Sequence, residues 1–295
     1  MRFSLIMPTL NRVDDVKRFM QSLDAQTFRD LELIVVDQNG DDSLREVLSP
    51  YVSHFPIKHI QTYKPIGAVA ARNMGAREMT GEVLGFPDDD CFYEPDFLQR
   101  VDTALKTHPE WDGLTGNVVG MENYYSKKPA YVTKYRVWWQ GLEFTLFYRK
   151  AIVNKIGLMD PTIGPGAKTR WGAGEGADYL LRAIAAGFKL FYDPTLKVHH
   201  PGPLTNPRSD AAEAKVIYGY SIGKGHVLHK HHYPLWYVLY LAIRPLVRGF
   251  GNVFRFRWSK ATISFAVTKG VLIGYFLSLR LAEAAGDVTG MTQSI

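Results

Sequence analysis

Short apolar segments alternate with amphipathic ones through the first third of the chain. The runs at 3–7 and 31–36 are almost entirely apolar, and between them apolar side chains recur at spacings of three and four. This alternation predicts strands at 3–7, 31–36, 57–61 and 83–86, and helices at 14–25, 42–48, 67–79 and 95–106. Strands without polar alternation are typical of a parallel sheet covered on both faces. The pattern therefore predicts an α/β, Rossmann-like fold with a mostly parallel sheet flanked by helices.

The middle of the chain is less regular. It predicts strands at 114–119, 144–148 and 189–192, a helix at 178–187 and a glycine-rich loop at 164–176. Prolines and glycines at 201–207 mark a boundary. We expect one domain over 1–213, with halves at 1–112 and 113–213, and a different region over 214–295.

Basic residues and apolar runs occur together in the region 214–295. Ten lysine and arginine residues, and no aspartate or glutamate, lie between positions 214 and 282, although the formal net charge of the whole chain is only +6. Such asymmetry points to a polyanion, either an anionic membrane surface or a nucleic acid. The apolar runs at 236–243 and 271–279 favour the membrane, and we expect no nucleic-acid partner.

Two apolar runs in this region, 235–243 and 261–279, predict helices. The first is too short to span a bilayer, and Lys269, Gly270 and Gly274 interrupt the second. We therefore expect a C-terminal extension of basic amphipathic helices that lie in the membrane plane. A helical domain that packs on the rest of the chain or forms a homodimer is the alternative.

Composition excludes several classes of protein. With 46% hydrophobic and 22% charged residues, the chain is neither disordered nor fibrous. One cysteine, Cys91, excludes a disulfide scaffold and a cysteine-rich zinc site. Because no long apolar leader opens the sequence, we expect no signal peptide and a cytoplasmic location.

Candidate chemistry gathers where predicted strands end. Asp88, Asp89 and Asp90 follow a strand directly, and adjacent carboxylates repel one another unless a cation or hydrogen-bond donors hold them. Mg²⁺ or Mn²⁺ together with a substrate phosphate would fit, and a solvated turn is the alternative. His199 and His200 follow another strand, where they could bind a metal or phosphate or be partly exposed.

Three further places could bind or catalyse, each with an ordinary structural alternative. Asp37 ends a strand, where it could accept a hydrogen bond from a base or ribose or form a turn. Arg72 could reach a diphosphate or make a surface ion pair. Glu175 and Asp178 lie where a loop meets a helix, so either could be a general base or a helix cap.

Taken in order along residues 3–203, these segments resemble the family 2 glycosyltransferases, which have the GT-A fold. The motifs that carry the resemblance are IMPTLNR at 6–12, QTF at 26–28, ELIVVD at 32–37, ARNMG at 71–75, GE at 81–82, FPDDD at 86–90, PDFL at 95–98, RK at 149–150, GLMD at 157–160, GEGAD at 174–178 and VHH at 198–200. Their order and spacing identify the family better than any one of them.

The resemblance implies an inverting transfer of a sugar from a nucleotide-sugar, most often a UDP-sugar, with Mn²⁺ or Mg²⁺ as cofactor. Residues 1–112 would then be the nucleotide-binding half, and 113–213 the acceptor and catalytic half. The metal ligands would be Asp90 and His200, with His199 as the alternative. The implied contacts to the nucleotide-sugar are Pro8, Thr9, Asn11, Arg12, Asp37, Arg72, Asp88 and Asp89.

The expected general base departs from the family pattern. The usual Glu-Asp pair is Glu175-Gly176 here, so the aspartate most often assigned as the base is absent. This leaves Glu175 as the first candidate and Asp178 as the second.

The resemblance also gives the basic tail a meaning. Many bacterial relatives build exopolysaccharide, capsule or O-antigen on polyprenyl-diphosphate carriers, so a lipid-linked saccharide is the expected acceptor. The tail would then hold a peripheral enzyme at the cytoplasmic face of the inner membrane. The alternatives are a polyprenyl-phosphate glycosyltransferase and a non-catalytic nucleotide-sugar-binding scaffold.

Overall fold

The apolar runs of the sequence become the strands of one sheet in the computed structural model, which describes residues 1–121, 124–201 and 210–291. The chain divides into a first unit of residues 1–161 and 175–205 and a second unit of residues 162–174 and 206–295. Most of the proline- and glycine-rich stretch at 201–207 lies outside the described residues. The expected division after residue 213 therefore stays a prediction.

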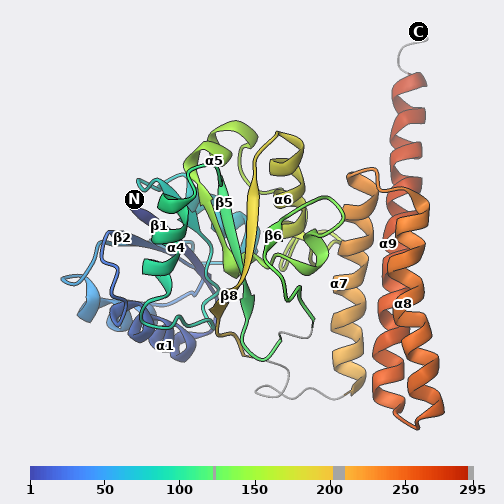
Figure 1. Ribbon diagram of the computed structural model, residues 1–295, viewed down its shortest axis with the longest axis horizontal. Helices are drawn as coiled ribbons and strands as arrows, with labels where there is room; N and C mark the ends of the chain where they lie inside the picture. Colours follow the sequence, from blue (N-terminus) through green and yellow to red (C-terminus); the bar gives the residue numbers. More distant parts are fainter. Residues whose placement is uncertain (122–123, 202–209, 292–295) are drawn as a thin grey trace. The chain divides into compact units, whose positions relative to one another are not determined.

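The described strands form a sheet in the order β3-β2-β1-β4-β7-β5-β8-β6 (Figure 1). Its first four members are parallel to one another: β1 (Phe3–Thr9), β2 (Leu31–Asp37), β3 (Ile57–Gln61) and β4 (Val83–Gly85). All residues of β1 and β2 are buried, which explains why these strands show no polar alternation. The predicted parallel, doubly covered sheet is confirmed in this part of the unit.

The other half of the sheet is mixed. It contains β5 (Gly113–Val118), β6 (Ala130–Tyr131), β7 (Leu146–Arg149) and β8 (Leu190–Val198). Strand β7 is antiparallel to both β4 and β5, and β6 is antiparallel to β8, whereas β5 and β8 are parallel. The sheet is therefore mostly parallel, with the GT-A-like arrangement that the sequence predicted.

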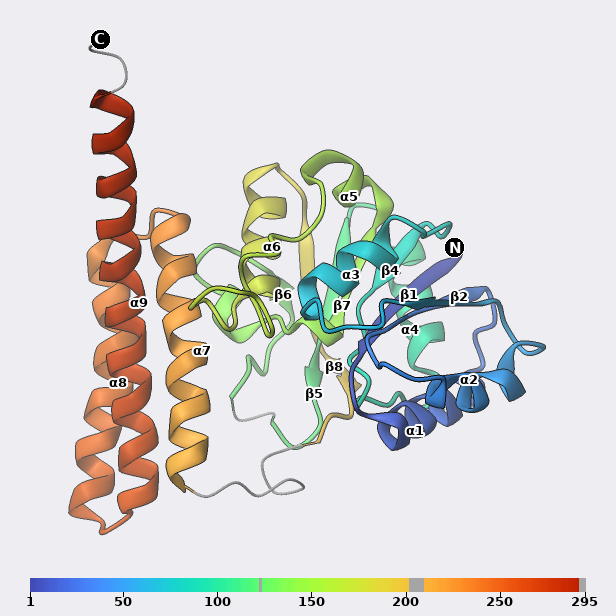
Figure 2. The ribbon, with the colours of Figure 1, turned by 180° about the vertical axis from the view of Figure 1, so that it is seen from behind.

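Helices cover both faces of this sheet. They are α1 (Val13–Asp24), α2 (Ser43–Leu48), α3 (Ala68–Ala76), α4 (Phe97–Thr107), α5 (Lys150–Ile156) and α6 (Glu175–Ala185), with 3₁₀ turns η1 (Ser49–Tyr51), η2 (Val137–Trp139) and η3 (Glu143–Thr145). Helix α4 lies in front of the sheet in Figure 1, and α3 lies in front of it in the reverse view of Figure 2. The sequence pattern missed α5 and β6, which are too short to show a period.

The core of the first unit is aromatic. Phe3 of β1 is fully buried, and its ring centroid lies 4.8 Å from that of Phe28 and 5.9 Å from that of Phe147. Helix α3 packs on β1 and β2 through Gly75, where an added Cβ would lie 2.6 Å from Cγ2 of Ile6. This close approach fixes α3, and with it the side chains that α3 directs toward the strand ends.

The second unit contains three helices in its described residues: α7 (Asp210–Lys230), α8 (Leu235–Phe254) and α9 (Trp258–Met291). Helix α9 packs on both α7 and α8 (Figure 1). Gly270 and Gly274 face α7, and a Cβ on Gly270 would lie 2.5 Å from Cβ of Ser221. The glycines that interrupt the apolar run at 261–279 thus allow two helix backbones to approach closely.

Exposed apolar residues accompany the basic residues of these helices. Helix α8 has a buried apolar face, and its exposed side combines Arg244 and Arg248 with apolar residues that include Trp236, Ile243, Val247 and Phe250. Within the described residues, the segment Trp258–Glu283 of α9 is long and apolar enough to cross a membrane. Core helices of soluble proteins also meet that criterion.

We expect Gly75→Ala to destabilise the first unit by about 1–3 kcal/mol, because the new methyl group overpacks the contact between α3 and β1. Gly40→Ala is the matched control, since nothing lies within 4 Å of the Cβ position there. Chemical denaturation of both variants measures the difference. Equal stabilities would mean that α3 shifts to accommodate the methyl group.

Candidate active site

The carboxyl ends of β1, β2 and β4 meet at one edge of the sheet, because these strands are parallel. The loop after β4 brings Asp89 and Asp90, both largely buried, to this edge. Arg12, which follows β1, donates from Nη1 to Oδ1 of Asp89 at 3.2 Å and to Oδ2 of Asp90. Donors therefore hold the acidic loop, and the solvated-turn alternative does not apply to these two carboxylates.

The charges of this loop shift one another's pKa values. Burial raises the pKa of Asp89 to about 7, although the positive charge of Arg12 opposes the increase. Burial alone would lower the pKa of Arg12, but the charges of Asp89 and Asp90 outweigh it and raise that pKa. Arg12 therefore lowers the pKa of Asp89 less than burial raises it, and the two aspartates in turn stabilise the charged form of Arg12.

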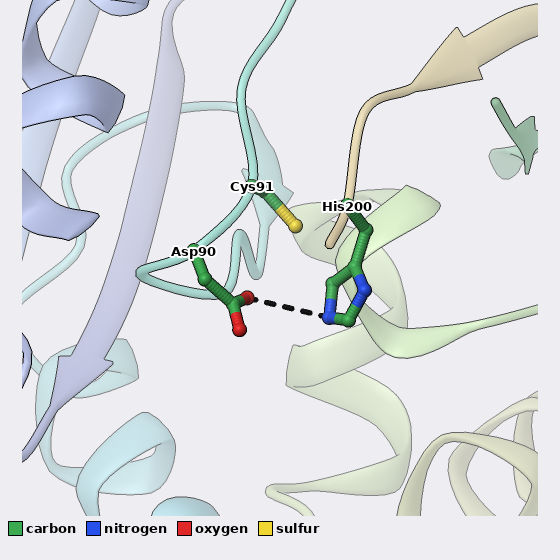
Figure 3. Close-up of side chains that lie close together, drawn as sticks. All are labelled: Asp90, Cys91 and His200. Atoms are coloured by element: carbon green, nitrogen blue, oxygen red, sulfur yellow. Dashed lines mark ion pairs between the residues drawn. The ribbon is translucent and has the colours of Figure 1, made fainter. Parts of the chain in front are cut away.

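Asp90 also faces a histidine from the far half of the sheet. His200 follows β8, and its Nε2 lies 3.3 Å from Oδ1 of Asp90 (Figure 3). The ring of His200 stacks on Phe144, with centroids 4.6 Å apart. His199 instead stacks on Phe92 and pairs with Glu94, so the structure brings His200, rather than its neighbour, to the acidic loop.

These side chains fit a divalent cation. Asp90, Cys91 and His200 offer ligand atoms that all lie within 4.8 Å of one another (Figure 3). Oδ1 of Asp90 is buried and accepts no hydrogen bond from the described residues. Burial, together with the neighbouring aspartates, raises the pKa of the Cys91 thiol well above its usual value, which keeps it a protonated, poor ligand. One carboxylate oxygen and one imidazole nitrogen remain, a set that Mn²⁺ or Mg²⁺ accepts with phosphate oxygens.

A buried arginine joins the acidic loop to α6. Arg72 of α3 donates from Nη2 to Oδ1 of Asp88 at 2.5 Å, and its Nη1 lies 3.4 Å from Oε1 of Glu175. Burial lowers the pKa of Arg72, but the charges of Asp88 and Glu175 outweigh that effect and raise it. Arg72 is therefore a permanent cation between two carboxylates rather than a surface residue.

The two predicted base candidates occupy different surroundings in α6. Asp178 is fully buried, and its Oδ2 accepts a hydrogen bond from Nε of Arg182 at 3.2 Å. Glu175 is 6% exposed, and burial, with the nearby charge of Glu143, raises its pKa to about 7. A carboxyl group with this pKa exchanges protons near neutrality, as a general base must.

Sequence reasoning missed Glu143. This residue begins η3, is half-buried, and accepts a hydrogen bond from the backbone N–H of Gly176 at 2.8 Å. It therefore adds a carboxylate to the first turn of α6. The one signal in the sequence was the glycine at 176, where the family pattern places an acidic residue.

A cleft of about 360 Å³ lies beside the ends of β1 and β2. It is lined by Asn11, Arg12, Val13, Asp14, Asp15, Asn39, Asp41 and Ser43. Asn11 adopts a left-handed conformation with φ of 57°, and its N–H donates to Oδ1 of Asn39 at 2.6 Å. Pro8 and Thr9, the last residues of β1, are buried next to this turn. The predicted nucleotide-contacting segment at 8–12 thus borders a real cleft.

Asp37 lies in the neighbouring strand but is turned inward. It is fully buried, with Oδ1 accepting from the N–H of Asn39 at 2.8 Å and Oδ2 lying 2.9 Å from Nε2 of His59. Its expected contact with a base stays a prediction. Asn39, which the sequence indicated only as part of a turn, lines the cleft, and its buried Nδ2 has no hydrogen-bond partner among the described residues.

Comparison with known proteins identifies the family of this chain. Residues 4–157 match the family model for glycosyl transferase family 2. The chain belongs to this family. A Bacillus subtilis member described as an uncharacterized glycosyltransferase, YwdF, is 28% identical over 172 residues, which cover 55% of this chain and 63% of the relative. In the first relatives matched, the aligned part covers between 35% and 63% of their length.

Solved glycosyltransferases share the fold. The mannosyltransferase PcManGT from Pyrobaculum calidifontis, in complex with GDP-Man and Mn²⁺, superimposes with a TM-score of 0.66 at 14% identity, over 92% of this chain and 86% of that one. S. aureus TarS 1–349 in complex with UDP-GlcNAc gives 0.56 at 17% identity, over 91% and 90%. These likenesses confirm the GT-A fold of this family 2 glycosyltransferase.

The raised pKa of Glu175 makes the stability of this family 2 chain depend on pH. The folded chain keeps the Glu175 proton up to about pH 7, whereas an unfolded chain releases it near 4.5. Stability therefore falls as pH rises through this window, because the folded state binds more protons there. We expect the free energy of unfolding of Glu175→Gln, measured relative to that of the wild type, to increase by roughly 1–3 kcal/mol from pH 5 to pH 8, because glutamine has no proton to lose.

Chemical denaturation at both pH values, with the exposed Glu46→Gln as control, measures this difference. A Glu175→Gln variant that is destabilised equally at pH 5 and pH 8 would show that the ion pair with Arg72 dominates instead.

Proposed function

We propose that this protein is an inverting, metal-dependent glycosyltransferase that takes a sugar from a nucleotide-sugar, with UDP-sugars as the first candidates. The observation that carries the proposal is the buried Oδ1 of Asp90, which accepts no hydrogen bond from the described residues and faces His200 at the strand edge that also borders the cleft. The nucleotide-sugars in the TarS and PcManGT complexes support the donor class.

The nucleoside would lie in the cleft beside β1 and β2. Pro8 and Thr9 end the strand there, and Asn11 shapes the turn. The side-chain amide of Asn39, which has no hydrogen-bond partner in the part of the chain that the structure describes, could donate to a base carbonyl, while Asp37 holds Asn39 in place through its N–H. Asp88 and Asp89 would hold the ribose side of the acidic loop, as the family resemblance implies.

The diphosphate would lie between Arg12 and the Asp90–His200 pair. Arg12 is half exposed and can turn its guanidinium to phosphate oxygens, which it binds well in a bidentate way. Asp90 and His200 would hold Mn²⁺ or Mg²⁺, which stabilises the charge on the departing diphosphate as a Lewis acid. Arg72, near Asp88, adds positive charge close to this position.

The general base would come from the carboxylates at the start of α6. Glu175 exchanges its proton near neutrality, whereas Asp178 is fully buried against Arg182. Of the two residues that the sequence predicted as the base, Glu175 therefore ranks above Asp178. The base removes the acceptor proton on the face opposite the leaving diphosphate, so the anomeric carbon inverts.

We expect Asp90→Asn to lower nucleotide release from the donor at least 100-fold and to weaken Mn²⁺ binding in calorimetry, because the variant loses the carboxylate charge that holds the cation. EDTA should abolish release by the wild-type chain, and Mn²⁺ or Mg²⁺ should restore it. The exposed Asp42→Asn is the control. Release that survives both EDTA and Asp90→Asn would contradict metal dependence.

The acceptor we propose is a polyprenyl-diphosphate-linked saccharide, which requires a membrane surface. Exposed aromatic residues where α8 ends and α9 begins support contact with a membrane. Phe254 and Phe256 are 82% and 80% exposed, and Trp258 is exposed beside them. Arg255 and Arg257 alternate with these rings and are exposed too. Aromatic side chains suit the interface of a bilayer, and the arginines attract anionic headgroups. The cytoplasmic face of the inner membrane stays a prediction.

We expect replacement of Phe254, Phe256 and Trp258 by alanine to reduce flotation on vesicles containing anionic phosphatidylglycerol, because the interfacial rings are lost. Tyr63→Ala, which removes an exposed ring from the first unit, is the control. Flotation unchanged by the triple substitution would contradict this membrane contact. If sedimentation shows dimers of the wild-type chain but not of the triple variant, the turn would instead be a surface for self-association.

A polyprenyl-phosphate glycosyltransferase is the second candidate, because α9 is long and apolar enough to span a bilayer. The acceptor separates the two. Transfer to polyprenyl phosphate itself would favour the second candidate, and transfer only to a lipid-linked saccharide would favour the first. Nucleotide-sugar binding without any turnover would favour a non-catalytic scaffold.

A further inference from the structure

The carboxylate of Glu143 fills the space that a side chain at position 176 would occupy. A Cβ built on Gly176 would lie 2.6 Å from both Cγ and Cδ of Glu143 and closer still to Oε1. Oε1 also accepts the N–H of Gly176 at 2.8 Å, so the carboxylate is held against the first turn of α6. A residue remote in sequence thus delivers a carboxylate to this point of the helix.

Glu143 is more accessible than Glu175 and Asp178, and it differs from all three neighbouring carboxylates in charge pairing. Glu175 and Asp88 both pair with the guanidinium of Arg72, and Asp178 pairs with Arg182. Glu143 is half-buried, and in the described part of the chain no cationic nitrogen lies within ion-pair distance of it. Its second oxygen is therefore free to accept a proton from a bound hydroxyl group.

Its position also suits the reaction. Glu143 immediately precedes Phe144, whose ring stacks on His200. The 3₁₀ turn η3 thus holds both a carboxylate at the start of α6 and the ring that supports the Asp90–His200 pair. A sugar whose diphosphate is bound at Asp90 and His200 would therefore lie close to this turn.

We propose that Glu143, rather than Glu175, is the general base that deprotonates the acceptor hydroxyl; this assignment rests on the proposed function. The acceptor O–H proton moves to the free oxygen of Glu143 as the acceptor oxygen forms a bond to the anomeric carbon. The bond from that carbon to the diphosphate oxygen breaks, and its electron pair leaves with the nucleoside diphosphate. Glu143 then returns the proton to solvent.

Glu175 takes a positioning role in this arrangement. Its ion pair with Arg72 connects α6 to the acidic loop, and its proximity to Glu143 helps to raise its own pKa to about 7. Glu175 thus holds α6, and with it the Gly176 N–H that binds Glu143, against the acidic loop.

The first test compares Glu143→Gln with Glu175→Gln and the exposed control Glu46→Gln. Nucleotide release is measured on a panel of UDP-, GDP- and dTDP-sugars with Mn²⁺ and a membrane lipid extract as acceptor source. We expect Glu143→Gln to lower kcat about 10²–10⁴-fold while the KM for the donor changes less than threefold. The glutamine keeps an oxygen for the Gly176 N–H, so the thermal midpoint should move only a few degrees.

The second test moves the carboxylate from position 143 to position 176, the residue that Glu143 contacts. Glu143→Ala should lose activity, and the double variant Glu143→Ala/Gly176→Asp should regain at least tenfold, because the aspartate grows into the space that Glu143 vacates. Glu143→Ala/Gly176→Ala is the matched control; it fills the space without a carboxylate and should stay inactive. An aspartate in the first turn of α6 also stabilises the start of the helix, so Glu143→Ala/Gly176→Asn is the second control; it supplies a polar side chain without a base and should stay inactive.

The outcomes separate the two proposals. A wild-type chain that releases no nucleotide from any donor overturns the proposed function, and the role of Glu143 with it. The role of Glu143 alone is overturned if the wild type is active, the kcat of Glu143→Gln is within threefold of the wild-type value, and Glu175→Gln is inactive. If Glu143→Gln does not fold, the double variant Glu143→Ala/Gly176→Asp decides the question. A double variant that folds but does not regain activity also overturns the role of Glu143.

Discussion

The buried guanidinium of Arg72 is the contact on which the arrangement of the site depends. It lies in α3 but reaches the loop after β4 through Asp88 and the first turn of α6 through Glu175. A buried cation that loses its counter-ions costs several kcal/mol, so the first unit cannot fold around α3 without bringing these two segments together. The close packing of Gly75 on β1 fixes α3 itself. The carboxylates of the proposed site are thus brought together by the same charges that stabilise the fold.

The sequence predicted the first half of the sheet well, because strands buried on both faces leave a simple apolar pattern. It could not predict that β7 runs antiparallel between β4 and β5, since apolarity does not specify the strand partner or its direction. The short elements β6 and α5 were not predicted, because they contain too few residues to show a hydrophobic periodicity. The tail was recognised as helical, but the packing of α9 on α7 was not, because glycines read as interruptions in sequence become contact points between helices in space.

For the site, too, the sequence predicted residues in local motifs but not the contacts between distant segments. Motifs located Asp90, His200 and Glu175, and the structure brings the first two within 3.3 Å of each other. Asp37 is where the sequence placed it, at the end of a strand, yet its oxygens are taken by Asn39 and His59, a pairing that depends on strand register. Glu143 belongs to no motif and could be found only through the space it fills beside Gly176.

The hydrogen bond between Arg12 and Asp90 has a thermodynamic consequence. In this arrangement Arg12 is the counter-ion of the carboxylate that would bind the divalent cation. A cation that binds Oδ1 of Asp90 would share this carboxylate with the guanidinium on Oδ2 and weaken that ion pair, so the guanidinium could turn to a diphosphate in the adjoining cleft. Each ligand thereby removes an obstacle to the other, so the two should bind with positive cooperativity, and by reciprocity the donor strengthens cation binding as much as the cation strengthens donor binding.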